Sequence, residues 1–174
     1  NNAIAEFALS GPNAGKFTAI HPLGTIEQTI DASDSDGAGG STAALIDDLF
    51  SKDRGIGLSM TRLTIGASDF SQSHYSYSAG SGQFDLSPVD ADIIPVMLAA
   101  KRANPDLWTM ASPWSAPAWM KSNGSLIQGQ LDPARHADFA NYLSAYVRGM
   151  AARGVTINAL SIQNEPHFEP TSYP

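Results

Sequence analysis

The 174-residue sequence contains no cysteine, and this absence removes several kinds of site at once. Without thiols the chain can form no disulfide, no cysteine-ligated zinc centre and no thiol nucleophile. Long apolar runs are also missing, since no stretch approaches the roughly 18 residues that a membrane-spanning helix needs. We therefore expect no transmembrane segment.

Basic residues are scarce as well. Ten Lys and Arg stand against 17 Asp and Glu, which gives a formal net charge of -7. A nucleic-acid partner requires clustered Lys and Arg, so we expect none. Hydrophobic residues make up 43% and charged residues 16%, a balance typical of a globular chain rather than a disordered one.

The hydrophobic pattern predicts alternating helices and strands after an N-terminal β segment. Helices are expected from Ser41, over residues 89–103 and over residues 133–153. Strands are expected over residues 16–20, 25–30, 58–65, 107–111 and 155–162. This order favours βα units around a parallel sheet, so we assign residues 1–30 to an N-terminal β segment and residues 31–174 to an α/β domain.

Small and acidic residues between Asp31 and Gly40 resemble a calcium loop at first sight. An EF-hand loop carries Glu at its twelfth position, whereas the twelfth residue here is Thr42. We therefore predict a solvated loop. The histidines lack metal-ligand spacing, and no G-x-S-x-G motif indicates a serine hydrolase.

Polar and aromatic residues follow the expected strands where each one ends, at residues 66–70, 112–121 and 163–166. The carboxyl ends of parallel strands form the active site of a (β/α)8 barrel. Glu165 ends an apolar strand, and partial desolvation there should raise its pKa toward that of a general acid. Asn164 beside it could bind a hydroxyl group, although a glutamate in an ordinary surface turn would give the same pattern.

Trp114 and Trp119 flank two prolines in one loop, and aromatic faces stack on the C–H faces of sugars. Both could instead be packing residues, because Trp is highly buried on average. Asp69 could bind ligand hydroxyls or merely cap a turn.

Several motifs in order resemble glycoside hydrolase family 30, which includes glucosylceramidases and β-1,6-glucanases. They are GIGLSMTRLTIGASDFS at 55–71, HYSY at 74–77, ASPWSAPAWMKSNG at 111–124, GQL at 129–131 and SIQNEPHFEPTSYP at 161–174. The resemblance implies a (β/α)8 TIM barrel with a side β-sandwich, to which the N-terminal segment would belong. It also implies a retaining β-glycosidase in which Glu165 is the acid/base and Asn164 contacts the sugar 2-hydroxyl.

The same resemblance implies a sugar pocket built from Asp69, Trp114 and Trp119, with Tyr173 at its rim. The substrate would be a carbohydrate or a glycolipid, no metal or organic cofactor would be needed, and the location would be extracellular. Glucosylceramidase-like, β-1,6-glucanase and xylanase specificities all stay open.

Two departures from the family pattern shape the remaining expectations. The residues 32–40 occupy the place of the usual first barrel strand. A complete barrel also needs about 250 residues, so we expect only the first half, strands one to four. No residue matches the family's nucleophile, and the nearby Asp69 and Glu169 do not correspond to it. We predict that the chain alone is inactive and self-associates through open strand edges. A non-catalytic carbohydrate-binding module and an inactive remnant are the alternatives.

Overall fold

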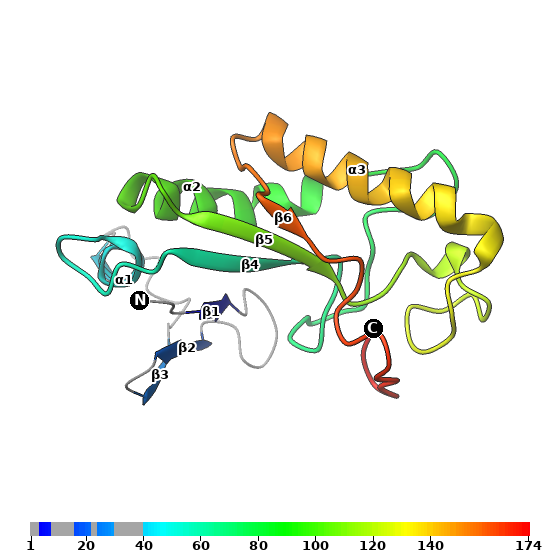
Figure 1. Cartoon of the computed structure of the whole chain (residues 1–174), viewed down its shortest axis with the longest axis horizontal. Coiled ribbons are helices and arrows are strands. Elements are labelled where there is room, and N and C mark those ends of the chain that lie inside the picture. Colours follow the sequence, from blue (N-terminus) through cyan, green and yellow to red (C-terminus); the bar gives the residue numbers. More distant parts are fainter. Residues whose placement is uncertain (1–3, 8–15, 22–23, 30–39) are drawn as a thin grey trace.

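The computed structural model describes residues 4–7, 16–21, 24–29 and 40–174 (Figure 1). Its strands are β1 (Ile4–Phe7), β2 (Lys16–His21), β3 (Gly24–Thr29), β4 (Met60–Ile65), β5 (Trp108–Pro113) and β6 (Ala159–Leu160). Its α-helices are α1 (Gly40–Phe50), α2 (Ile93–Ala103) and α3 (His136–Ala152). Short 3-10 turns cover Ser87–Asp90, Ala118–Met120 and Pro133–Arg135.

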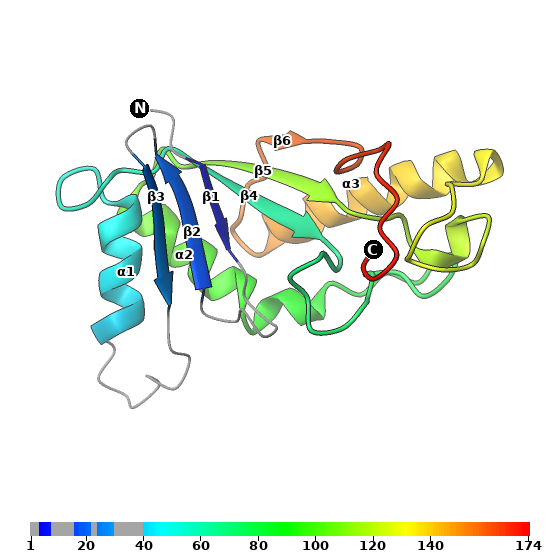
Figure 2. The ribbon, with the colours of Figure 1, turned by 90° about the horizontal axis from the view of Figure 1, so that it is seen from below.

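The described strands form one sheet in the order β3-β2-β1-β4-β5-β6 (Figure 2). β4 and β5 pair in parallel along their whole length, from Met60 opposite Trp108 to Ile65 opposite Pro113, and β6 continues this parallel part. α2 connects β4 to β5 and α3 connects β5 to β6, as in βαβ units. The expected α/β architecture is confirmed, and the parallel strands are consistent with part of a barrel.

β1 was not expected from the sequence, and it lies parallel to β4 in the neighbouring position of the sheet. It therefore stands where a strand preceding β4 in a barrel would stand. The expected strands β2 and β3 are confirmed and continue the same sheet in antiparallel fashion. A side β-sandwich stays a prediction, as does the domain boundary at residue 30. Of the expected loop at residues 31–40, residues 31–39 lie outside the described part of the chain.

α2 and α3 cover one face of β4 and β5, and much of the core lies between these layers (Figure 1). Alternate residues of β4 point into this core, because successive side chains of a strand face opposite sides. Thr61, Leu63 and Ile65 are buried, whereas the residues between them are half-buried. The opposite face, which carries Arg62, is therefore left for polar groups.

Three expected elements need correction. The strand expected over residues 155–162 is limited to β6, and just before its start the Asn158 side-chain oxygen, rather than a backbone carbonyl, accepts from the Thr109 N–H (2.9 Å). The helix expected over residues 89–103 is broken: a 3-10 turn ends at Asp90 and α2 starts at Ile93. β5 runs two residues beyond its expected end at Ala111, through Pro113.

Exposed apolar residues next to the free edge of β6 predict self-association. Within the described strands β6 pairs only with β5, and Leu160 and Ile162 beside this edge are 36% and 72% exposed. Unpaired edges of this kind recruit further strands. We expect light scattering to show species larger than a monomer, and Ile162→Lys to reduce their fraction. Ile56→Lys places a charge at an exposed loop position away from this edge and should leave the fraction of larger species unchanged. A parent chain that is entirely monomeric would refute the prediction.

Candidate active site

The segment after β6 crosses the carboxyl ends of β4 and β5, where the polar strand ends were expected to meet (Figures 1 and 2). Two backbone hydrogen bonds fix its start. The Ser161 N–H donates to the Ala111 carbonyl (3.0 Å), and the Asn164 N–H donates to the Pro113 carbonyl (2.8 Å). Asn164 and Glu165 are therefore anchored to the end of β5.

Arg62 connects three of the elements at this site. It projects from β4, its guanidinium carbon lies 4.8 Å from the ring centre of Trp114, and its Nη2 donates to the Asn164 side-chain oxygen. Its Nε is buried without a hydrogen-bond partner among the described residues. Cation–π stacking and a charge-assisted hydrogen bond together orient both Trp114 and Asn164.

The sequence analysis missed Arg62. The available signal was a single cation in the middle of the apolar strand LSMTRLTI, because Arg is rarely placed inside a sheet without a partner.

Glu165 is exposed in the structure, which contradicts the partial desolvation expected at a strand end. The reason is that β6 ends at Leu160, so Glu165 lies in an open turn in which the Phe168 N–H donates to its carbonyl (2.9 Å). Its φ of 42° is left-handed, although it is not a glycine and precedes Pro166. A non-glycine residue in this region costs on the order of 1–3 kcal/mol, and such residues cluster at functional sites.

Tyr173 lies close enough to Asp69 and Glu165 for their charges to act on its phenol. The pKa of Tyr173 is raised, first by desolvation and then by these two carboxylates. The structure thus gathers the candidates from three separate segments: Asp69 after β4, Glu165 after β6, and Tyr173 further along the chain. Carboxyl and phenol oxygens of this kind can hydrogen-bond the hydroxyl groups of a ligand.

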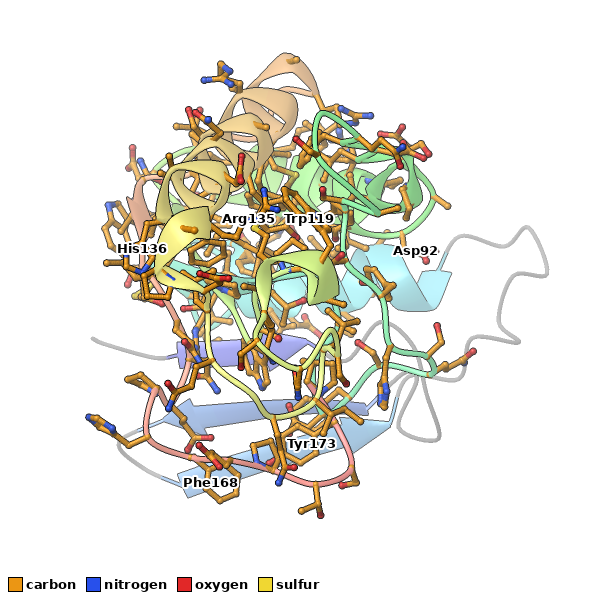
Figure 3. All side chains as sticks on the ribbon, turned by 90° about the vertical axis from the view of Figure 1, so that its right-hand side faces the viewer. Asp92, Trp119, Arg135, His136, Phe168 and Tyr173 are labelled. Carbon is orange, nitrogen blue, oxygen red and sulfur yellow. The ribbon has the colours of Figure 1, made fainter. Side chains whose placement is uncertain are left out.

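The two tryptophans of the SPWSAPAW segment lie in different places. Trp114 is buried and lines a pocket of about 420 Å³ that Gln163 and Pro166 also line. Trp119 lines another hollow, where its Nε1 donates to Ser78 Oγ (3.0 Å). Figure 3 shows Trp119 beside Arg135 and well separated from Tyr173. Trp119 lies within the 3-10 turn at residues 118–120 and lines a different hollow from Trp114, so it does not join the other candidates.

Lys121 fastens the loop that borders the Trp114 pocket. Its Nζ donates to Ser115 Oγ and to the Leu126 carbonyl, both at 2.8 Å. Desolvation of the half-buried ammonium lowers its pKa to about 8. Between this value and the ordinary 10.5, the unfolded chain binds more protons than the folded one, so stability from Lys121 rises with pH in that window.

Replacing Lys121 by Met should remove this rise. Between pH 7.5 and 9.5 the parent should gain free energy of unfolding relative to Lys121→Met, by about 1 kcal/mol or less because solvent screens the partly exposed group. Urea titrations at several pH values would measure it. Lys52→Met, at an exposed position, should retain the pH dependence of the parent, and parallel curves for the parent and Lys121→Met would contradict the prediction.

The described residues contain no group of three or more His, Cys, Asp or Glu side chains that could hold a metal ion. His74, His136 and His167 are all exposed. None of the helices in this part of the chain combines the length and apolar character that crossing a bilayer requires.

Comparison with known proteins places these motifs in one family. The model of the glycosyl hydrolase family 30 TIM-barrel domain matches residues 33–172. An endo-1,6-β-D-glucanase of Neurospora crassa is 37% identical over 124 residues, which are 64% of this chain and 26% of the relative. The lysosomal acid glucosylceramidase of Mus musculus is 29% identical over 124 residues, 64% of this chain and 24% of that protein.

Solved structures agree with this match. An endo-β1,6-glucanase superimposes with a TM-score of 0.72 at 33% identity and covers 75% of this chain and 32% of its own. SrfJ from Salmonella typhimurium superimposes with a TM-score of 0.71 at 34% identity, and the match covers 75% of this chain and 31% of SrfJ. The chain thus spans about a quarter to a third of the length of the proteins it matches.

Proposed function

Because the chain belongs to glycosyl hydrolase family 30, we propose that it supplies the acid/base part of a retaining β-glycoside hydrolase. The observation that carries the proposal is the connection from Arg62 through Asn164 to the neighbouring Glu165 at the carboxyl ends of the parallel strands. Active sites of TIM barrels lie at this end. The proposed substrate is a β-glucoside, either an oligosaccharide or a glycolipid, and the proposed location is extracellular.

In this mechanism Glu165 protonates the leaving oxygen of the glycosidic bond, and the bond to the anomeric carbon breaks as a carboxylate attacks that carbon. Glu165 then takes a proton from the water that releases the covalent glycosyl-enzyme. Asn164, held by Arg62, would hydrogen-bond the sugar 2-hydroxyl. Asp69, Trp114 and Tyr173 would enclose the sugar.

Retaining chemistry requires a second carboxyl group about 5–5.5 Å from the first. We propose that neither Asp69 nor Glu169 takes this role and that the nucleophile comes from outside these 174 residues. The chain by itself should then show no turnover. A measured turnover that disappears in Glu165→Gln would contradict this part of the proposal.

A chimera tests the proposed activity. Residues 33–172 replace the matching segment of the Neurospora endo-1,6-β-D-glucanase, which supplies the rest of the barrel. The chimera should hydrolyse a β-1,6-glucan and release its product first as the β-anomer. NMR of the anomeric protons during the reaction measures this configuration. A cooperatively folded chimera without activity would count against the function, and an α-anomeric first product would exclude the retaining mechanism.

A further inference from the structure

A second hollow of about 420 Å³ lies between the loop that carries Phe84 and the face of α3 that carries Asn141 and Arg148. We call it the α3 hollow, and its lining includes Gln83, Phe84, Trp119, Asp138, Asn141 and Arg148. Its volume falls within the range of about 300–1,000 Å³ that is usual for small-ligand sites. Both of its walls belong to the described part of the chain.

The aromatic groups of the hollow are held in place. Phe84 is 37% exposed, and its ring packs edge-on against Tyr142 (5.9 Å between ring centres) and Tyr77 (6.5 Å). Trp119 is fixed by the Ser78 hydrogen bond and by the Arg135 guanidinium, 5.2 Å from its ring centre (Figure 3). Rigid aromatic rings lose little entropy when a ligand stacks on them.

The polar groups of the hollow point to a neutral ligand. The side-chain amides of Gln83 and Asn141 are exposed and make no hydrogen bond within the described residues, so both can donate and accept. The two charged residues of the lining are of opposite sign: Asp138 forms an ion pair with Arg135 (3.1 Å), and Arg148 donates a hydrogen bond to Ser144 Oγ. An ionic ligand would meet a like charge, whereas a sugar has an apolar face and a rim of hydroxyls.

We propose that the α3 hollow binds a segment of a β-linked glucan chain, as a second carbohydrate site separate from the candidate active site. Phe84 and Trp119 would contact the apolar face of a sugar ring, and Gln83 and Asn141 would hydrogen-bond its hydroxyls. The assignment gives a role to Trp119, which lies apart from Glu165 and its neighbours. It does not depend on catalysis.

The three tryptophans of the chain allow both sites to be followed separately. In the 5-fluorotryptophan-labelled chain, 19F NMR should give one resonance each for Trp108, Trp114 and Trp119, assigned by single Trp→Phe variants. Titration with β-1,3-, β-1,4- and β-1,6-linked glucotetraoses should shift the Trp119 resonance with at least one of them. Trp114 reports on the candidate active site.

Two variants test the contacts. Asn141→Ala should weaken binding at the Trp119 resonance about fivefold, as one lost hydrogen bond predicts, and Phe84→Ala should weaken it about tenfold. Arg102→Ala, also an exposed helix position, should leave it unchanged. The proposal is overturned if no glucotetraose moves the Trp119 resonance, or if both variants bind as the parent does. A response at Trp114 alone would support the proposed function and overturn the second site.

Discussion

Glu165→Gln is expected to lower kcat of the chimera on a β-1,6-glucan by about 10²–10⁴-fold, the usual contribution of a general acid–base group. Gln has nearly the same shape as Glu but cannot give or take the proton that the leaving oxygen and the attacking water require. Glu165 has a left-handed backbone, and Gln has the same backbone preferences as Glu, so we expect the substitution to change the chemistry without changing the turn. Initial rates at saturating substrate measure the effect.

The leaving group separates a lost proton donor from a damaged site. An aryl β-glucoside whose phenol has a low pKa needs no protonation, so Glu165→Gln should form the glycosyl-enzyme from it nearly as fast as the parent chimera. A burst of phenol followed by slow turnover is therefore expected. Asp53→Asn, at an exposed position away from the site, is the control for loss of one negative charge. Equal losses on the glucan and on the aryl glucoside would show that Glu165 only supports the structure.

The spacing of apolar residues along the sequence was sufficient to predict the elements that carry a long, regular pattern of buried positions. The apolar face of α3, which buries Tyr142 and Tyr146, repeats at helical spacing, and β4 alternates between buried and half-buried residues. β1 was missed because a four-residue strand has too little pattern of its own and exists through pairing with β2 and β4. β6 begins only after Asn158, whose side chain takes the place of a backbone acceptor, and no periodicity reveals this.

In the candidate site, too, the residues could be proposed from local sequence, whereas their contacts depend on the tertiary fold. Glu165 and Asn164 could be proposed from their position after an apolar strand, but their relation to Arg62 depends on bringing together residues 102 positions apart. The sequence places Trp114 and Trp119 five residues apart in one loop, which suggested a single pocket. Trp119 instead lies in a 3-10 turn and lines a different hollow from Trp114, and the direction of such a turn is set by tertiary packing rather than by composition.

Tyr146→Ala should be the most damaging substitution in the core, with a loss of about 3–5 kcal/mol in the free energy of unfolding. Tyr146 is fully buried in α3, and its ring stacks on that of Tyr77 at 5.8 Å beneath the loop that leads toward Phe84. Alanine would leave a cavity where the helix packs against this loop. Urea denaturation followed by circular dichroism measures the change.

Tyr146→Phe separates the ring from the hydroxyl. The Tyr146 hydroxyl is buried and has no hydrogen-bond partner among the described residues, so it carries a desolvation cost without a compensating bond. Its removal should leave stability unchanged or raise it by about 1 kcal/mol, while the stacking on Tyr77 is kept. A loss of 2 kcal/mol or more in Tyr146→Phe would be on the scale of a broken buried hydrogen bond. It would show that the hydroxyl does have a partner, such as a buried water, and that the packing argument for this part of α3 needs that partner.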